Sequence, residues 1–339
     1  MNRKGEAEKR GKGEQKVSSS PYLLFSASKM FVVLILLLIL ALALAILLGS
    51  ERLAFFDLNE SQAAILYDIR LPRVLLGACV GASLALAGAS LQSLLRNPLA
   101  EPYLLGVSNG AALGTMLAFV FFAQIEFARP VFAFAGASLA TFAVYQMAKS
   151  RAGMNVERLV LSGVIVTTFL SSIIVLLTSL LDAAKLRSFT FWLLGDLSQA
   201  TRSGFYLTFA VAVAGTIILS SQARALNLLM IGERDAFDFG VEVGRVRMIV
   251  FAVASVLVGS SVAASGSVGY VGLIVPHLIR LLIGSDNRLV VPFSAISGAI
   301  FVVLADTVAR VAIAPRELPV GAITALIGAP LFIYLLRRN

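Results

Sequence analysis

Few residues of this chain could carry out covalent or metal chemistry. Cys79 is the only cysteine and His277 the only histidine, so an internal disulfide and a multi-cysteine metal site are both excluded. No acidic cluster accompanies His277 in the sequence. We therefore expect no catalytic, cofactor-binding or metal-binding residues, and we interpret Cys79 as a small buried hydrophobic residue.

A dense group of polar residues interrupts the apolar part of the chain in RNPLAEPYLLG, residues 96–106. Pro98 and Pro102 remove backbone donors and prevent a regular helix. Polar side chains here, among them Asn97 and Glu101, need water or protein partners that lipid cannot supply. The stretch predicts a hairpin between two membrane spans, folded at the mouth of a protein-lined pathway. The alternative is an ordinary polar loop whose prolines only stop helices.

A second break follows in VGLIVPHLIR, where Pro276 precedes His277. Ionisable groups inside a membrane are usually functional, so a proton relay is one interpretation of His277. Because no acidic partner is evident nearby, we expect a structural hydrogen bond in a broken helix instead. Asp306 and Arg310 lie four residues apart and are expected to pair on one helical face.

The composition predicts the element type that must position these residues. Of 339 residues, 58% are hydrophobic and 14% charged, with a mean hydropathy of +0.90, whereas soluble domains carry about 25% charged residues. Apolar runs that approach the ~20 residues needed for a spanning helix recur along the chain. We therefore predict an all-α polytopic membrane protein with about ten spans, at residues 29–49, 72–93, 103–123, 129–149, 159–181, 204–221, 247–265, 270–284, 289–309 and 318–336.

Basic residues predict the orientation of these spans. Residues 1–28 are predicted to be a disordered basic tail and residues 29–339 the transmembrane domain. A cleaved signal peptide fits less well, because the apolar run at 31–48 is longer than the hydrophobic region of a usual signal peptide. With the tail in the cytoplasm, 19 of the 28 Lys and Arg residues fall on that side, as the positive-inside rule expects. Both termini are therefore expected in the cytoplasm of an inner-membrane protein. This orientation accounts for most of the net charge of +9, so no nucleic-acid partner is needed to explain it.

The chain also repeats itself at an offset of 178 residues. Small residues of GASLALAG recur in GSSVAASG, where Gly81 and Gly88 match Gly259 and Gly266, and the same offset carries Pro98 onto Pro276 and Gly106 onto Gly284. Small residues are common at helix contacts in membranes, but six matches at one offset favour duplication. The two copies begin five spans apart, so they are expected to run in opposite directions, as in transporters with inverted repeats.

Four motifs in order resemble one known family. They are RLPR at 70–73, the hairpin with its following helix at 96–114, GYVGLIVPHLIR at 269–280 and ELPVGAITALIGAPLFIYLL at 317–336. The chain resembles the FecCD-type permeases of ABC importers, which take up iron-siderophore complexes, haem and cobalamin. The resemblance runs from about residue 30 to the C-terminus.

The resemblance implies a type II importer permease that works with several other chains. These are a second permease subunit, identical or a paralogue, two ATPase subunits at the cytoplasmic face and an extracytoplasmic substrate-binding protein. The spans themselves are expected to contact membrane lipid. The chain contains no G-x-x-x-x-G-K-[ST] phosphate loop. It is therefore expected to be a transport subunit, not an enzyme, with ATP hydrolysis in a partner chain.

Three arginines match the family's docking positions for the binding protein. They are Arg70 and Arg73 of RLPR and Arg310 of DTVARVAIAPRELP, and the resemblance places them at the outer surface. An arginine fork can bind a carboxylate through two parallel hydrogen bonds. The alternative is that these side chains only anchor helix ends at the interface.

The resemblance assigns ATPase coupling to the cytoplasmic loop at about residues 222–246, which overlaps RALNLLMIGERDAFDFGVEVGRVRM at 224–248. Mixed charges and apolar residues suit short helices that lie in a groove of a soluble partner. Phenylalanine stands where the family has leucine at position 239, and Asn287 departs from the family's frequent histidine; Asn287 is assigned no role. The matching coupling positions are Leu229, Gly232, Glu233, Ala236, Phe239 and Gly240.

The hairpin at 96–106 gains a gating role from the same resemblance. Asn97 and Leu99 match one element of the family's cytoplasmic gate, and Val156 and Glu157 align with the other. A gate needs bulk that can withdraw, which suits Leu99. Pro98, Pro102, Pro276 and His277 are then structural residues of broken helices, and Trp192 belongs to a short amphipathic helix near the outer mouth.

Two other classes of protein remain to be compared. An ion- or proton-coupled secondary transporter would also allow an inverted repeat, but it should show carboxylates or other ionisable groups in the middle of the spans. A membrane-embedded protease or transferase would need a nucleophile, paired aspartates or a metal site. The sequence offers neither set convincingly.

Overall fold

The structure is a computed structural model that describes residues 21–49, 59–122, 124–125, 127–150, 153–154 and 156–338. Apart from a hairpin of two short strands, these residues fold almost entirely as helices and their connections. The elements are α1 (Pro21–Leu47), α2 (Glu60–Ala64), the π-helix η2 (Ile65–Arg70), α3 (Leu71–Leu95), the 3₁₀-helix η3 (Pro102–Leu105), α4 (Val107–Phe121), α5 (Ala128–Ala148), β1 (Lys149–Ser150), β2 (Gly153–Met154), α6 (Val156–Thr178), α7 (Ala183–Leu193), α8 (Arg202–Ser221), α9 (Ala223–Ile231), α10 (Glu233–Asp238), α11 (Val243–Ser265), α12 (Val271–Ile283), α13 (Asn287–Val311) and α14 (Val320–Arg338).

Each of the ten predicted spans coincides with one apolar helix. Among the described residues, seven helices are long and apolar enough to cross a membrane, and the apolar parts of α4, α12 and α14 are shorter. With 13 residues, α12 is about 20 Å long, less than the ~30 Å of the hydrocarbon core. The prediction of an all-α membrane protein is confirmed, with seven crossings supported by length and composition.

The start of α1 changes the predicted boundary of the tail. α1 begins at Pro21, so residues 21–28 are already helical where the sequence predicts a disordered tail. Residues 1–20 of that tail lie outside the described residues.

Helix α3 forms the centre of the bundle. Its side chains are buried almost throughout, including the polar Gln92 and Ser93, and it packs against α8, α11, α12 and α13. The helix continues backwards through η2 into α2, so residues 60–95 form one helical rod. The sequence analysis missed this extension, because Pro72 suggests a helix start. The π-turn absorbs the hydrogen-bond break that Pro72 imposes.

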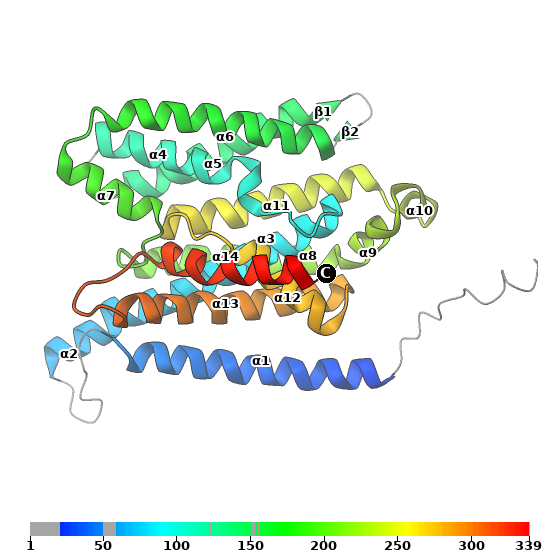
Figure 1. Cartoon of the computed structure of the whole chain (residues 1–339), viewed down its shortest axis with the longest axis horizontal. Coiled ribbons are helices and arrows are strands. Elements are labelled where there is room, and N and C mark those ends of the chain that lie inside the picture. The colour runs from blue at the N-terminus through cyan, green and yellow to red at the C-terminus, as the bar shows by residue number, and fades with distance from the viewer. Residues whose placement is uncertain are drawn as a thin grey trace, which may run out of the picture.

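The helices are arranged as the inverted repeat predicts. Figure 1 shows α4, α5 and α6 on one side of the bundle, α12, α13 and α14 on the other, and α3 and α11 between them, running in opposite directions. α3 packs on α12 and α13, whereas α11 packs on α4 and α5. Each central helix therefore packs against the peripheral helices of the other half.

The proline matches of the repeat are wrong in structural detail. Pro98 lies in the connection after α3, whereas Pro276 lies inside α12. The offset does not hold because the connection from α3 to α4 has eleven residues and that from α11 to α12 has five. α11 ends at Gly266 in a left-handed conformation, while the matching Gly88 lies within α3.

Close backbone contacts explain two of the glycines in α3. A Cβ at Gly81 would overlap the carbonyl of Gly298 in α13, and a Cβ at Gly88 would overlap the carbonyl of Gly272 in α12. Small residues let membrane helices approach closely enough for extensive van der Waals contact. These two glycines set how near α12 and α13 lie to α3.

Different elements lie at the two ends of the bundle. At one end lie α10, the β1–β2 hairpin, the start of α1 and the end of α14 (Figure 1); we call it the coupling end. At the opposite end lie α2, α7 and the connection from α13 to α14 (Figure 1); we call it the arginine end. The sequence predicts the same grouping of connections, with the coupling end in the cytoplasm.

Candidate translocation and coupling site

A buried ionic cluster lies at the arginine end, where α3 meets α13. The guanidinium of Arg73 donates to Asp306 Oδ1 at 2.9 Å and to Glu317 Oε2 at 2.7 Å. Arg310 Nε lies 3.1 Å from Asp306 Oδ2, so the predicted pairing of Asp306 with Arg310 is confirmed. Asp306 is 2% exposed, and this single carboxylate therefore holds two buried cations.

The other arginine donors hold the end of α1. Arg70 Nη1 donates to Ile46 O at 2.8 Å and Arg310 Nη2 to Ala45 O at 3.0 Å. The last carbonyls of a helix have no partner within that helix, and cationic donors there are favourable. These contacts fix α1 against the α3–α13 pair.

The exposure predicted for these three arginines is wrong. Arg70, Arg73 and Arg310 are 5%, 6% and 4% exposed, because their donors are turned toward α1 carbonyls and the two carboxylates. Their location at one end of the bundle agrees with the prediction. Glu317, which the sequence analysis left without a role, is the more accessible member of the cluster, with a side chain 35% exposed.

The predicted gate hairpin lies at the coupling end. α3 ends at Arg96, a non-glycine residue in the left-handed conformation. The Asn97 side chain accepts a hydrogen bond from Leu99 N at 2.9 Å, and Asn97 O accepts one from Ala100 N at 3.0 Å. Pro98 fits this turn because it needs no backbone donor. The turn buries Ala100 and leaves Leu99 46% exposed, so Leu99 has the accessible bulk that a gate needs.

The second pair of gate residues begins α6. Val156 is the first residue of this helix, and Glu157 is exposed in its first turn. η3, which forms the second half of the hairpin, packs against α6. The two predicted gate elements are therefore neighbours through η3.

Hydrogen bonds tie the hairpin to the connection between α11 and α12. Glu101 Oε1 accepts from Tyr270 N at 3.1 Å, and the Tyr103 hydroxyl bonds both the N–H and the carbonyl of Val268 at 3.0 Å. A cavity of about 270 Å³ opens beside these residues, and its lining is Glu101, Tyr103, Ser108, Asn109, Val164, Thr167 and Thr168. Most of the cavity surface is apolar, but the carboxylate, hydroxyls and amide in its lining need water or protein partners in a membrane.

Gln92, not His277, bonds the carbonyls near the proline in α12. Pro276 cannot donate to the carbonyl four residues earlier, that of Gly272. Gln92 Nε2 lies 3.0 Å from Leu273 O and 3.4 Å from Gly272 O. The His277 ring contacts Phe332 of α14. The prediction of a hydrogen-bonded His277 in a broken helix is wrong in this respect, because α12 stays helical through Pro276 and the ring packs against an aromatic side chain.

The predicted coupling loop folds as two short helices, α9 and α10. Leu229 and Ala236 are buried and attach these helices to the bundle. Phe239 is 74% exposed, and so are Phe237 at 71% and Ile231 at 70%. Sequence reasoning missed Phe237 and Ile231, although a helical projection of MIGERDAFDF could have placed Phe237 away from Ala236. These three residues, the α9–α10 apolar edge, lie outside the spanning helices.

Glycine and an ion pair shape the same two helices. Gly240 adopts a left-handed conformation after α10, and Val241 N closes the helix end on Ala236 O at 2.9 Å, a Schellman arrangement. Glu233 Oε1 accepts from Arg96 Nη2 at 3.3 Å and also from Arg247 Nη2. Gly232 separates the two helices. The predicted coupling residue Glu233 thus joins α10 to Arg96 at the start of the gate hairpin.

Two peripheral helices, α6 and α14, carry polar groups on their outer faces that lipid cannot satisfy. Pro330 lies exposed inside α14 and cannot donate to the carbonyl of Leu326; the Leu326 residue as a whole is 72% exposed. An unsatisfied carbonyl facing hydrocarbon is costly. α6 in turn lines the polar cavity through Thr167 and Thr168. These faces favour a protein partner or water over lipid.

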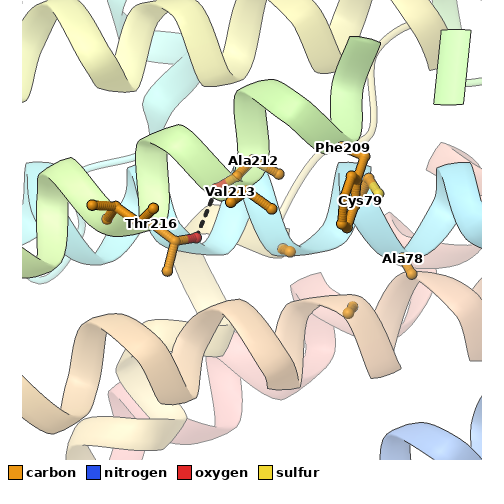
Figure 2. A pocket seen from close by; sticks show the side chains of 9 residues that line it. Ala78, Cys79, Phe209, Ala212, Val213 and Thr216 are labelled. Atoms are coloured by element: carbon orange, nitrogen blue, oxygen red, sulfur yellow. Dashed lines mark hydrogen bonds between the residues drawn. The ribbon is translucent and has the colours of Figure 1, made fainter. Parts of the chain in front are cut away.

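A second, apolar cavity carries no comparable chemistry. It measures about 320 Å³ between α3, α8 and α13, and Cys79 and Phe209 lie on its wall (Figure 2). The only hydroxyl shown there, on Thr216, donates to Ala212 O at 2.7 Å (Figure 2). Cys79 is buried, as predicted. Within the part of the chain that the structure describes, no three His, Cys, Asp or Glu side chains gather to hold a metal.

Comparisons with known proteins agree on one assignment. The model of the FecCD transport family matches residues 30–338. The chain is 44% identical over 285 residues to the cobalamin import system permease protein BtuC of Halobacterium salinarum, covering 83% of this chain and 76% of that protein. It is 39% identical over 286 residues to the hemin transport system permease protein HmuU of Yersinia pestis, covering 83% and 85%.

A solved structure shares the fold. It is described as an inward-facing conformation of a metal-chelate type ABC transporter, and its chain is 34% identical to this one. The two superpose with a TM-score of 0.84, which covers 92% of this chain and all of that chain.

Proposed function

The chain belongs to the FecCD transport family and is a permease subunit of an ABC importer, and from this premise we propose that it imports a metal chelate of the iron-siderophore, haem or cobalamin class. It works in the inner membrane with its coupling end in the cytoplasm. A secondary transporter, the earlier alternative, finds no support in this family.

The α9–α10 apolar edge is the observation that carries the proposal of a separate ATPase. Ile231, Phe237 and Phe239 are each at least 70% exposed at one end of the bundle, beside charged residues of α10. An amphipathic helix that lays an apolar face into a groove is a common mode of docking on a soluble protein. ATP hydrolysis then takes place in the partner chain, and two such partners serve a pair of permease subunits.

The second permease subunit faces α6 and α14. Polar side chains line part of the cavity beside α6, and Pro330 removes one backbone donor from α14; both features favour a wet or protein-covered face. The translocation path runs between the two copies, and Leu99 of each hairpin closes it at the coupling end. Asn97 positions Leu99, and Val156 and Glu157 begin the neighbouring helix of the gate.

The arginine end receives the substrate-binding protein. Arg70, Arg73 and Arg310 outnumber Asp306 and Glu317, so the cluster has a net charge of +1, which favours an acidic partner surface. Because the arginines are buried, docking reaches the cluster first at Glu317, and direct arginine contacts require α1 to shift. Exchange of Glu317 for lysine should therefore alter docking before any arginine substitution does.

The test is purification of the tagged chain from its native membrane in mild detergent, with and without substitutions in the apolar edge. We expect an ATPase to co-purify with the wild-type chain and to be lost from Phe237→Asp and Phe239→Asp. Phe127→Asp is the matched control, because Phe127 is 61% exposed at the arginine end. A wild-type chain that imports labelled haemin or cobalamin without any ATPase would contradict the proposal.

A further inference from the structure

Asn287, the first residue of α13, is the centre of a polar network at the coupling end. It is fully buried. Its backbone N–H and its side-chain amide both donate to Asn227 Oδ1, at 2.8 and 2.9 Å. Asn227 belongs to α9, so this side of the network attaches the first coupling helix to α13.

The opposite side of Asn287 contacts α3 and α12. Its Oδ1 accepts from Ser93 Oγ at 2.6 Å and from Arg280 Nη2 at 3.2 Å. Arg280 Nη2 also lies 2.7 Å from Ser93 Oγ and 3.0 Å from Ala89 O. One buried amide therefore connects α9 with the last turns of α3 and α12.

The attachment of α9 is reinforced at the start of α13. Asn227 Nδ2 donates to Asp286 Oδ1 at 2.6 Å, and Asp286 is the N-cap of α13. The whole network consists of Asn227, Asp286, Asn287, Ser93 and Arg280. Because Asn287 is inaccessible to water, displacement of α9 alone would leave buried donors and acceptors unpaired, which costs more than an exposed contact.

A second link between the coupling helices and α3 is much more exposed. Glu233 pairs with Arg96, and both side chains are nearly half exposed. Exposed ion pairs of this kind contribute little. The buried network is therefore the stiffer connection from α9 to α3.

The position of Ser93 links the buried network to the Leu99 hairpin. Ser93 lies in the last turn of α3, three residues before Arg96, where the chain enters the hairpin that carries Leu99. A displacement of α9 that moves Ser93 also moves the start of this hairpin.

We propose that Asn287 is a positioning residue that transmits movement of the coupling helices to the end of α3 and to the Leu99 hairpin. The inference rests on the proposed function, in which an ATPase moves α9 and α10. Asn287 touches neither the transported solute nor the ATPase. Its substitution should separate ATP hydrolysis from transport without preventing assembly.

The experiment uses the complete importer in proteoliposomes and measures ATP hydrolysis together with uptake of labelled cobalamin and haemin. In Asn287→Leu we expect ATPase activity within about twofold of wild type and transport per ATP lowered by about three- to thirtyfold, the usual range for coupling substitutions. Ser93→Ala removes a single hydroxyl and provides a milder variant that should fold. Arg288→Gln is the matched control, because Arg288 is the exposed neighbour of Asn287.

A double substitution distinguishes transmission from ordinary stabilisation. If the network acts as one connection, Asn227→Ala combined with Ser93→Ala should lower transport per ATP no more than either single change, because each breaks the same link. Independent structural contributions would add instead. An unchanged ratio of transport to hydrolysis in Asn287→Leu would overturn the inference and leave the importer function standing. A wild-type complex with no ATP-driven uptake would overturn both.

Discussion

At the scale of single residues, Asp306 is the member of the arginine cluster whose loss should be felt most. It is the carboxylate shared by Arg73 and Arg310, and all three side chains are at most 7% exposed. Asp306→Asn keeps the shape but leaves two buried cations with less compensation, a loss of about 3 kcal/mol or more. We expect a markedly lower unfolding temperature of the purified importer, measured in detergent by differential scanning fluorimetry.

The matched control for this change is Asp68→Asn. Asp68 pairs with Arg202 at 2.6 Å, but both side chains are 62% exposed. Such pairs typically contribute about 1 kcal/mol or less, so the unfolding temperature should hardly change. If both substitutions lowered the unfolding temperature equally, water would screen the charges of the Asp306 cluster more than its burial indicates.

The contact between Gln92 and α12 makes a second prediction at this scale. Gln92→Leu leaves the carbonyls of Gly272 and Leu273 without the side-chain donor that now lies 3.0 to 3.4 Å away. An unsatisfied buried acceptor costs about 1–3 kcal/mol. Pro276→Ala supplies a backbone N–H to Gly272 O, so Gln92→Leu should cost less in that background. A thermal double-mutant cycle measures the difference, and strict additivity would rule out this compensation.

At the scale of elements, the glycine contacts between central helices should be intolerant of even one methyl group. Gly88→Ala would place its Cβ on the Gly272 carbonyl, which is backbone and cannot rotate away. We expect α3 and α12 to separate, with a loss of about 1–3 kcal/mol and poor recovery of folded protein on size-exclusion chromatography. Gly244→Ala in α11 is the control, because a Cβ there meets nothing within 4 Å; a normal yield from Gly88→Ala would refute the tight contact.

The element positions could be predicted from sequence because each helix of a membrane protein is a long apolar run between polar breaks. The repeat could be found for a similar reason, since Gly81 and Gly259 mark the two central helices. The extension of α3 back to Glu60 could not, because Pro72 suggests a helix start and a π-turn has no simple sequence signature. The start of α1 could not be predicted either, because the proline and serines of PYLLFSAS at 21–28 separate this part of the helix from the long apolar run that follows.

The sites were predictable only where neighbours in sequence are also partners in space. Asp306 and Arg310 lie one helical turn apart, so their pairing follows from spacing. The burial of Arg73 depends on partners more than 230 residues away. Asn287 drew no interpretation from sequence for the same reason, since its contacts with Ser93 exist only once α3 and α13 are packed.

At the scale of the whole molecule, the two halves of the repeat leave α6 and α14 on the outside of the bundle. α3 and α11 bury their surfaces against the opposite halves, whereas α6 and α14 pack mainly on their own neighbours. Pro330, which cannot donate to the carbonyl of Leu326, lies on α14, and the cavity that polar side chains line in part lies beside α6. A second permease subunit across this face would cover what lipid cannot satisfy.

This arrangement predicts where a crosslinker will find the second subunit. Cys79, the only native cysteine, is buried, so a benzophenone maleimide should label cysteines introduced at exposed positions. Leu326→Cys in α14 and Phe169→Cys in α6 replace side chains that are 72% and 64% exposed. On irradiation in native membranes both should capture a permease-sized chain, and mass spectrometry then identifies it as a second copy or a paralogue. Leu207→Cys is the control, because Leu207 is 66% exposed on α8, whose outward residues are apolar through the middle of the helix. Capture of the same chain from Leu207 but not from Leu326 would move the subunit interface to α8, and the path with it.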